Sequence, residues 1–300
     1  MPCIGILRSK LAVFFYRSID SSGKQEKMFT RLVSLKGMRF WDKGILLSCS
    51  AYSMVRLCIL QSAMLEIGQV AYIARYLVKS MAGEIVEQAN LTESGLDGDR
   101  LYAFESSSAP TGMLRVSNRE RREMLRYQPH LIAGGKVEVL CPTGELFPVE
   151  SQGLLDYLRN HTLDSSTFSL TQASTPQTDV RPLSLISLQT IHQLSAEIDH
   201  ALDPRRFRAN LYLDLPNGPF LEDNQVGRVI RIGSVATVLI RERSPRCRFI
   251  TYDPEAPHTT DPLFSLMKLL DRNRQGRVGV YASIVVPGHI QADDPVWQMD

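Results

Sequence analysis

Apolar and polar residues alternate along many short segments of this chain, which predicts a protein built mainly from β-strands. Alternation over four to eight residues is typical of strands with one buried face. The segments with this pattern are 69–80, 91–105, the hairpin 136–150, 211–215, 228–233, 234–242, 247–253, 278–288 and 294–299. Within 91–105, a turn at Asp97-Gly98 precedes the second strand. Many short strands with few helices favour a closed β-barrel decorated by helices.

Three segments have the spacing of helices instead, and each follows a residue that can cap a helix. They are 118–127 after Ser117, 188–200 after Ser187 and 263–274 after Asp261, with Pro262 at the first helical position. In the first of them, Met124 and Leu125 form the apolar side. The segment 161–182 is rich in Ser, Thr, Gln and Pro, so it is predicted to be a linker or a long surface loop.

The start of the chain differs from the rest. Residues 1–66 have no consistent period and are predicted to be an extension; the natural chain is expected to begin at Met64. Residues 45–65 are apolar, but Arg56 makes them a poor membrane span, because a central charge costs about 2.5–3.5 kcal/mol. The order of an export signal is also missing.

Composition narrows the function classes. The 300 residues are 44% hydrophobic, enough for a large core, and the net charge of +2 gives no reason to expect nucleic acid or an acidic membrane as partner. The cysteines are odd in number and irregularly spaced, which argues against a disulfide framework and favours a reducing, cytoplasmic compartment. They are Cys3, Cys49, Cys58, Cys141 and Cys247, without the C-x-x-C spacing of zinc or iron–sulfur sites. Walker, G-x-G-x-x-G, G-x-S-x-G and H-E-x-x-H motifs are missing too.

Cys247 is the first chemical candidate, because four arginines surround it in the sequence. A free cysteine is most often a small core residue, but nearby arginines can lower a thiol pKa or hold an anionic ligand. In a regular strand, Arg246 and Arg248 would point away from the face of Cys247. The residues alone leave the buried and the chemical interpretation open.

Cationic and hydroxyl side chains also gather at the ends of predicted elements. They are Lys79 and Ser80 after a strand, Arg100 after a tight turn, and Arg205, Arg206 and Arg208 in the basic turn 203–210. Guanidinium groups suit the capture of phosphate or carboxylate, although exposed arginine clusters are often only solvated surface. For Arg100 the alternative is a surface ion pair with Asp97 or Asp99.

Seven segments, taken in this order, resemble the MOSC-domain proteins. They are "YLVKSMAGE", "LTESGLDGDRLYAF", "RVSNRER", "DPRRFRANLYLD", "PFLEDNQVGRVIRIG", "SPRCRFITYDPE" and "GVYASIVVPGHIQADDPVW". The sequence is similar to the bacterial two-part members and to the mitochondrial amidoxime-reducing component, from about Ile67 to Trp297. It departs from their pattern at Leu77, Ala209, Ser244 and Asp293.

The resemblance implies a mainly β fold with some α, in which a β-rich N-terminal MOSC β-barrel domain (67–165) precedes a MOSC-type barrel domain (166–300). It also implies a molybdenum cofactor, a pterin whose dithiolene holds the metal. Cys247 would be the metal ligand and a catalytic residue, and Asp253 would orient the ligand loop or relay protons, its alternative role being that of a turn residue. The residues expected to contact the pterin or its phosphate are Lys79, Ser80, Arg100, Ser187, Arg208 and Asn210.

The function implied by the resemblance is that of an oxidoreductase that removes oxygen from a small N-hydroxylated compound, with electrons from a separate protein. Pyridoxal phosphate binding is a further expectation from the family. The first alternative is a cofactor or sulfur carrier that uses Cys247 as a persulfide site, without substrate turnover. The second is a non-catalytic barrel in which Cys247 is buried and the arginines are exposed.

Overall fold

The structure is a computed structural model that divides the chain into two units, Met1–Met64 and Leu65–Asp300. It describes residues 11–19, 25–34, 64–107, 121–161, 167–178, 180–257 and 261–299. In the first unit, β1 (Leu11–Ile19) pairs antiparallel with β2 (Gln25–Ser34). Most of the apolar segment 45–65 lies outside the described residues. No helix in the described ranges is long and apolar enough to cross a membrane.

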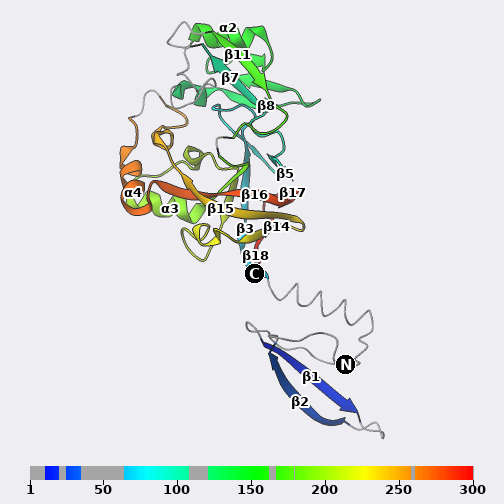
Figure 1. Ribbon diagram of the computed structural model, residues 1–300. Helices are drawn as coiled ribbons and strands as arrows, with labels where there is room; N and C mark the ends of the chain where they lie inside the picture. The colour runs from blue at the N-terminus through cyan, green and yellow to red at the C-terminus, as the bar shows by residue number, and fades with distance from the viewer. Residues whose placement is uncertain are drawn as a thin grey trace. The chain divides into compact units, whose positions relative to one another are not determined.

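A sheet of eight strands forms the centre of the second unit (Figure 1). Its strands follow one another in the order β13 (Leu211–Asp214), β12 (Leu183–Ser187), β16 (Arg277–Val286), β15 (Ala236–Pro245), β14 (Val229–Ile232), β18 (Pro295–Met299), β3 (Met64–Arg75) and β4 (Glu84–Val86). A further pairing joins β3 to β13, so the sheet closes on itself. The predicted mainly β fold with a closed barrel is therefore confirmed.

The alternation of side chains explains how the barrel is filled and covered. On β13, Leu211 and Leu213 belong to the barrel core, whereas Tyr212 between them belongs to a cluster on the other face. On β12, Leu185 and Ile186 divide in the same way. Successive side chains of a strand point to opposite faces, so each of these strands contributes to two apolar layers.

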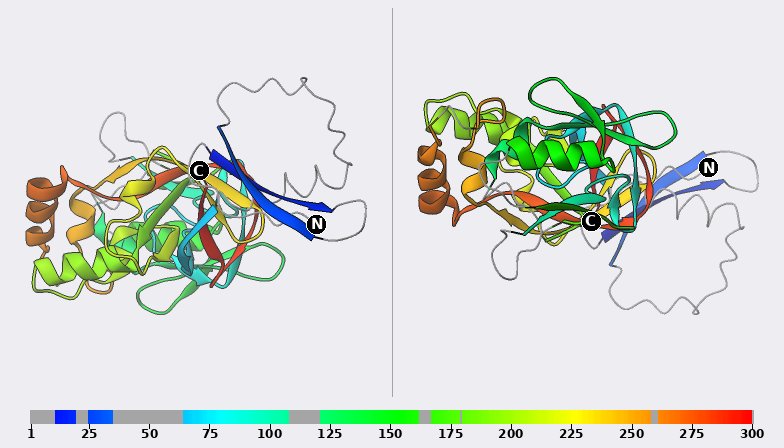
Figure 2. Two further views of the ribbon diagram at one scale, coloured as in Figure 1. Left: turned by 90° about the horizontal axis from the view of Figure 1, so that it is seen from below. Right: turned by 90° about the horizontal axis from the view of Figure 1, so that it is seen from above.

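Two helices supply the outer layer, α3 (Leu188–Glu197) and α4 (Phe264–Arg274), which lie at one end of the unit (Figure 2). Their apolar residues pack with the outward side chains of the barrel, and Leu194 and Leu266 are fully buried there. The Ser187 cap is confirmed, because its hydroxyl accepts a hydrogen bond from the Thr190 amide.

The cap predicted for the last helix is wrong. Helix α4 begins at Phe264, and its N-cap residue is Leu263 rather than Asp261. The Leu263 amide donates to the Thr251 carbonyl at 2.9 Å, which ties the residue before the helix to the turn that follows Cys247. This long-range contact sets where the helix starts.

A second core lies beside the barrel and is built mostly from residues 77–168. Its elements are β7 (Tyr102–Ser106), the 3-10 helix η1 (Arg122–Arg126), β8 (Gln128–Leu131), β9 (Val137–Leu140), β10 (Leu146–Pro148), α2 (Gln152–His161) and β11 (Phe168–Gln172). The hairpin of β9 and β10 is confirmed. A small separate sheet joins β5 (Gln88–Thr92) to β6 (Gly95–Leu96) and β17 (Gly288–Gln291).

Two predictions for this region need correction. The segment 161–182 is not a continuous linker, because its residues 168–172 form β11 and pair with β7, where Phe168 is buried. The helix predicted at 118–127 is a 3-10 helix over 122–126 in its described part, with Met124 and Leu125 buried as expected. Its proposed cap, Ser117, lies outside the described residues.

The two cores do not separate along the chain at one point. Strand β3 contributes Ile67, Val70 and Ile73 to the barrel core, together with residues from 183 onward. A few residues later, Leu77 and Val78 belong to the second core. The division into domains 67–165 and 166–300 stays a prediction. Residues 67–75, at the start of the first predicted domain, belong to β3 and therefore to the barrel sheet.

Candidate functional site

Six of the eight residues predicted for the site line one cavity of about 270 Å³ in the second unit. They are Cys247, Lys79, Ser80, Arg100, Arg208 and Asn210. Arg246, Arg206 and Tyr281 also line the cavity, and its lining residues come from before, within and after the segment 161–182. The structure thus gathers into one place groups that are up to 202 positions apart in the sequence, from Lys79 to Tyr281.

Lys79 and Ser80 follow strand β3 where the chain leaves the barrel. The Lys79 amide donates to the Tyr102 carbonyl at 2.8 Å, next to a bridge between Val78 and Tyr102. Ser80 is 4% exposed and has a φ of 74°. Pairing with β7 therefore fixes the local backbone, and the left-handed conformation of Ser80 turns the chain at the cavity wall.

Arg100 is held by a buried ion pair with its neighbour Asp99. Asp99 is fully buried, and one of its carboxylate oxygens accepts from the Tyr76 amide at 2.8 Å while the other pairs with the Arg100 guanidinium. The expected alternative was a surface pair with Asp97 or Asp99; the pair is with Asp99, and it is buried. It fixes the orientation of Arg100 toward the cavity.

The guanidinium groups of Arg208 and Arg100 both lie over the ring of Tyr76. The guanidinium carbons lie 4.3 Å (Arg208) and 4.6 Å (Arg100) from the centroid of the Tyr76 ring. Arg208 donates to the Met81 carbonyl at 2.6 Å, and Arg100 donates to the Arg208 carbonyl at 3.4 Å. Burial lowers the pKa of Arg208 to about 10, and the Arg100 cation acts in the same direction. Cation–π contact offsets only part of the cost of bringing two buried cations together.

Backbone strain is concentrated in this cavity. Ser80, Arg100 and Arg208 all adopt left-handed conformations, with φ values of 74°, 50° and 48°. Non-glycine residues seldom occupy this region, and such strain tends to collect at functional sites. All three residues were chosen from the sequence for their side chains, and the structure adds a backbone feature that the sequence did not indicate.

The segment around Cys247 is not a strand, which corrects the prediction for 247–253. Strand β15 ends at Pro245, and the 3-10 helix η4 (Arg248–Thr251) follows, with Cys247 at its N-cap position. Pro245 cannot donate to a sheet, and the next amide, of Arg246, donates to Gly276 at 2.8 Å instead. Because the chain turns here, Arg246 and Cys247 both line the cavity rather than pointing to opposite faces.

Cys247 is partly exposed and packs on one side against an apolar cluster of Leu125, Phe249 and Tyr252. Its other surroundings are the cavity with its cations. The interpretation in which Cys247 is buried among apolar residues and the arginines are exposed does not fit this arrangement, since Arg206 is only 4% exposed.

Arg246 brings another buried guanidinium to the site. Nε donates to the Val278 carbonyl at 2.8 Å and Nη1 to the Phe207 carbonyl at 2.7 Å. Nη2 is buried and has no hydrogen-bond partner among the described residues. Burial lowers the pKa of Arg246. A buried donor without a partner is costly, which points to a ligand that accepts from it.

Gly279 makes room for this guanidinium. It has a φ of +68°, and an added Cβ would lie 2.8 Å from the Leu185 carbonyl oxygen and 3.0 Å from Nη2 of Arg246. We expect Gly279→Ala to lower the free energy of unfolding by about 2–5 kcal/mol, from left-handed strain plus crowding. Denaturant unfolding checks this.

The matched control is Gly134→Ala. Gly134 has a φ of +82°, but nothing lies within 4 Å of its added Cβ. Left-handed strain alone should cost this variant about 1–2 kcal/mol. Equal losses in the two variants would show that the approach of Arg246 to Gly279 is not tight.

Asn210 and Ser184 hold three strands together at the edge of the cavity. The Asn210 side-chain oxygen accepts from the Ser184 amide at 3.2 Å and from its hydroxyl at 2.9 Å. Its side-chain nitrogen donates to the Ala74 carbonyl at 3.4 Å. These bonds connect β13, β12 and β3. Asn210 therefore holds the cavity wall in place in addition to lining the cavity.

Ser187 and Asp253 do not line the cavity. Ser187 is fully buried at the start of α3, where its amide donates to Glu222 and its hydroxyl bonds Thr190. Burial raises the pKa of Glu222, and its other carboxyl oxygen has no partner in the described part of the chain. The role of Ser187 that the structure supports is helix capping.

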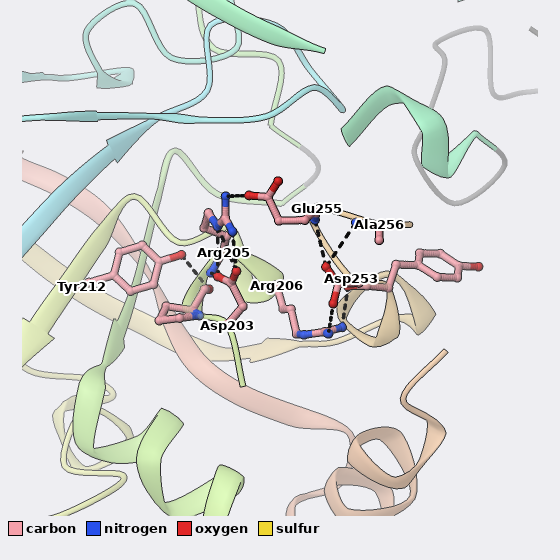
Figure 3. Close-up of polar contacts among 9 residues, drawn as sticks. Asp203, Arg205, Arg206, Tyr212, Asp253, Glu255 and Ala256 are labelled. Carbon is pink, nitrogen blue, oxygen red and sulfur yellow. Dashed lines mark hydrogen bonds and ion pairs between the residues drawn. The ribbon is translucent and has the colours of Figure 1, made fainter. Parts of the chain in front are cut away.

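Asp253 acts as a turn residue, in keeping with its alternative role. Oδ1 accepts from the Glu255 and Ala256 amides at 2.9 and 3.3 Å, and Oδ2 pairs with Arg206 at 3.2 Å (Figure 3). Arg206 itself lines the cavity and donates to the Tyr252 carbonyl at 2.6 Å. Asp253 thereby fixes the chain after Cys247 to the basic turn 203–210.

Sequence reasoning missed Ser184 and Tyr281, which also line the cavity. Both lie on strands, β12 and β16, that pair antiparallel at these two residues. The alternation in "LSLIS" before the helix cap was a usable signal for β12, but nothing in the sequence indicates that Tyr281 and Ser184 face the same cavity.

Comparison with known proteins identifies part of the chain. The MOSC domain family matches residues 173–297. None of the curated proteins matches the chain. Among solved structures, the YuaD protein from Bacillus subtilis is 12% identical with a TM-score of 0.44, over 79% of this chain and 98% of its own. YiiM from Escherichia coli is 14% identical with a TM-score of 0.37, over 77% and 70%.

The family match spans β12 through most of β18 and includes Arg208, Arg246 and Cys247, whereas Lys79, Ser80 and Arg100 precede it. The recognition made from seven sequence segments is thus confirmed for the domain itself. The chain contains a MOSC domain at residues 173–297, preceded by a β-rich region that contributes to the same cavity.

Proposed function

We propose that this chain binds a molybdenum cofactor in the 270 Å³ cavity and reduces small N-hydroxylated compounds. The observation that carries the proposal is that the Cys247 thiol, Arg208 and Arg246 line the same cavity. Among the described residues, these two partly buried guanidinium groups donate to backbone carbonyls and form no salt bridge. Buried cations without anionic partners are costly, so an anionic ligand would stabilise this site.

The lining residues fit a phosphorylated pterin. The lining includes six cationic side chains, Lys79, Arg100, Arg181, Arg206, Arg208 and Arg246, and no carboxylate. Three of them pair with carboxylates outside the cavity lining: Arg100 with Asp99, Arg181 with Glu242 and Arg206 with Asp253. The unpartnered Nη2 of Arg246 is a further donor for an anion. Bidentate guanidinium contacts of this kind suit phosphate oxygens.

The cofactor, when bound, would supply the redox chemistry of molybdenum. The residues of the chain would do the rest. Cys247, as a thiolate, would ligate the metal, because soft sulfur ligands suit transition metals and bind in the deprotonated form. Leu125, Phe249 and Tyr252 would exclude water from one side of the sulfur. Arg208 and Arg246 would hold the pterin phosphate.

The proposed reaction breaks the N–O bond of the substrate. Two electrons from the separate donor protein and two protons from water reduce the N–OH group; one proton goes to the nitrogen, and the other converts the released hydroxide to water. This proposal assigns one protein ligand, Cys247, to the metal; within the described residues no three His, Cys, Asp or Glu side chains gather as a metal-ligand set. The donor protein, the cytoplasmic location and pyridoxal phosphate binding stay predictions from the family.

A direct test is metal analysis of the purified protein together with fluorescence of its oxidised pterin. We expect the Arg208→Gln variant to retain about one tenth or less of the pterin bound by the unmodified protein. The reason is that a hydrogen bond to a charged group contributes about 1.5–3 kcal/mol. Thermal stability without cofactor should not fall, since the substitution removes a buried cation that lacks a salt bridge.

The control is Arg205→Gln. Arg205 belongs to the same turn but is 53% exposed, pairs with Asp203 and Glu255, and does not line this cavity. Its pterin content should match that of the unmodified protein. Equal pterin loss in both variants, or molybdenum and pterin absent from protein made in a cofactor-producing host, would refute cofactor binding.

The alternative of a sulfur carrier has support from Cys247 itself. Its thiol is partly exposed in a cavity of cations, which would also stabilise an anionic persulfide. Sulfur released by cyanide from protein that holds no metal would favour the carrier. Molybdenum bound in stoichiometric amount would favour the oxidoreductase.

A further inference from the structure

A second and larger cavity, of about 540 Å³, lies in the same unit. Its volume falls within the range of about 300–1,000 Å³ that is typical of small-molecule sites. It shares Arg208 with the cofactor cavity, but its other lining residues are different. About three quarters of them precede residue 173 and therefore lie outside the MOSC domain match.

One wall of this cavity is aromatic. The rings of Tyr72 and Tyr212 stack with centroids 4.3 Å apart and an interplanar angle of 18°. The hydroxyls of Tyr76 and Tyr212 are committed to the backbone, to the Ala209 and Pro204 carbonyls at 3.1 and 3.0 Å. The Tyr72 hydroxyl has no hydrogen-bond partner among the described residues. The wall therefore offers ring surface and one available hydroxyl group.

The charge of the lining favours an anion. Three cations line the cavity, Arg126, Arg205 and Arg208, against one carboxylate, Glu255. Glu255 pairs with Arg205 at 2.5 Å, and Arg205 also pairs with Asp203 (Figure 3). Arg126 is exposed and makes no ion pair or hydrogen bond with described residues. It is the cation best placed to receive an incoming anionic group.

Paired strands and a hydrogen-bonded turn supply another part of the lining. Gln128 and Leu140 are paired across β8 and β9, and both line it. The turn after β9 is closed by a hydrogen bond from the Gly144 amide to the Cys141 carbonyl at 3.0 Å. Elements from the second core thus face the aromatic wall of the barrel strands.

We propose that this cavity is a separate binding site for a small planar aromatic compound that carries a negative charge, such as an aromatic carboxylate. The ring would pack beside Tyr72, and its anionic group would meet Arg126. The site does not depend on the proposed cofactor, since only Arg208 is common to both cavities.

The test uses the full chain and three probes: benzoate, neutral benzyl alcohol and inorganic phosphate. Ligand-observed NMR titration measures the affinity of each. Benzoate should bind at least about tenfold more tightly than benzyl alcohol, because the charged contact adds about 1.5–3 kcal/mol. Tyr72→Leu and Arg126→Gln should each weaken benzoate binding by at least about fivefold.

Arg246→Gln is the matched control, because Arg246 lines the cofactor cavity alone. It should weaken phosphate binding and leave benzoate binding unchanged. The proposal is overturned when benzoate does not bind, or when Tyr72→Leu and Arg126→Gln both bind benzoate as tightly as the unmodified chain does. Benzoate lost only in Arg246→Gln would also overturn it and assign the anion to the first cavity. None of these outcomes depends on molybdenum content, so the two proposals can fail separately.

Discussion

Replacing Cys247 by serine is expected to abolish molybdenum binding and lower reductase activity at least about a hundredfold. Changes to groups that merely support a metal ligand cost about 10–100-fold, and loss of the ligand itself should cost more. A serine hydroxyl keeps the size of the side chain but is a poor, protonated ligand at neutral pH. Metal analysis and assay of the same preparation measure both effects.

Cys141→Ser is the control for this experiment. Cys141 is 3% exposed, lines the other cavity, and has its pKa raised to about 11 by burial, so its thiol stays protonated. We expect its variant to retain molybdenum. If Cys247→Ser kept its metal and activity, Cys247 would not be the ligand. If Cys141→Ser lost both, the cause would be general damage to the fold.

Asp99→Asn should produce a large loss of stability, at least comparable to that expected for Gly279→Ala. The change keeps the shape of the side chain but leaves the Arg100 guanidinium without its buried carboxylate. Breaking a buried ion pair by removing one partner costs about 3–5 kcal/mol. Denaturant unfolding should show this loss, and pterin content should fall as Arg100 is no longer held.

The neighbouring acid Asp97 supplies the comparison. Asp97 is exposed, and Asp97→Asn should change the free energy of unfolding by no more than about 0.5 kcal/mol. A similar small change in Asp99→Asn would mean that water reaches the Asp99–Arg100 pair. The effect then could not be assigned to a buried charge.

Most strands were predictable because they alternate in polarity, and β14 shows why. Ile230 and Ile232 belong to the barrel core while Arg231 between them is partly exposed, a pattern that the residues carry on their own. Ser187 was equally predictable as a cap, because the requirement is local. Side-chain chemistry alone singled out Cys247, Lys79, Ser80, Arg100 and Arg208, and the resemblance assigned them to one cofactor site together with Asn210; these six residues share the cavity.

The errors occurred where distant contacts decide local structure. Residues 168–172 read as a linker, yet they complete a sheet with β7, which lies some 66 positions earlier in the paired register. The predicted strand at 247–253 is a turn and a 3-10 helix, because Pro245 ends β15 and Arg246 bonds to Gly276. Neither partner can be recognised from the segment itself.

The sequence by itself determined the fold class, the cap of α3 and the residue types that the site needs. These depend on periodicity, on local hydrogen bonds and on the chemistry of side chains, which short segments contain. Only the tertiary structure decided that Arg100 and Arg208 share the Tyr76 ring and that Arg246 keeps an unpartnered donor. It also excluded Ser187 and Asp253 from the cavity lining. These features arise where barrel closure brings β3 beside β13, and the meeting of segments far apart in the chain is a property of packing.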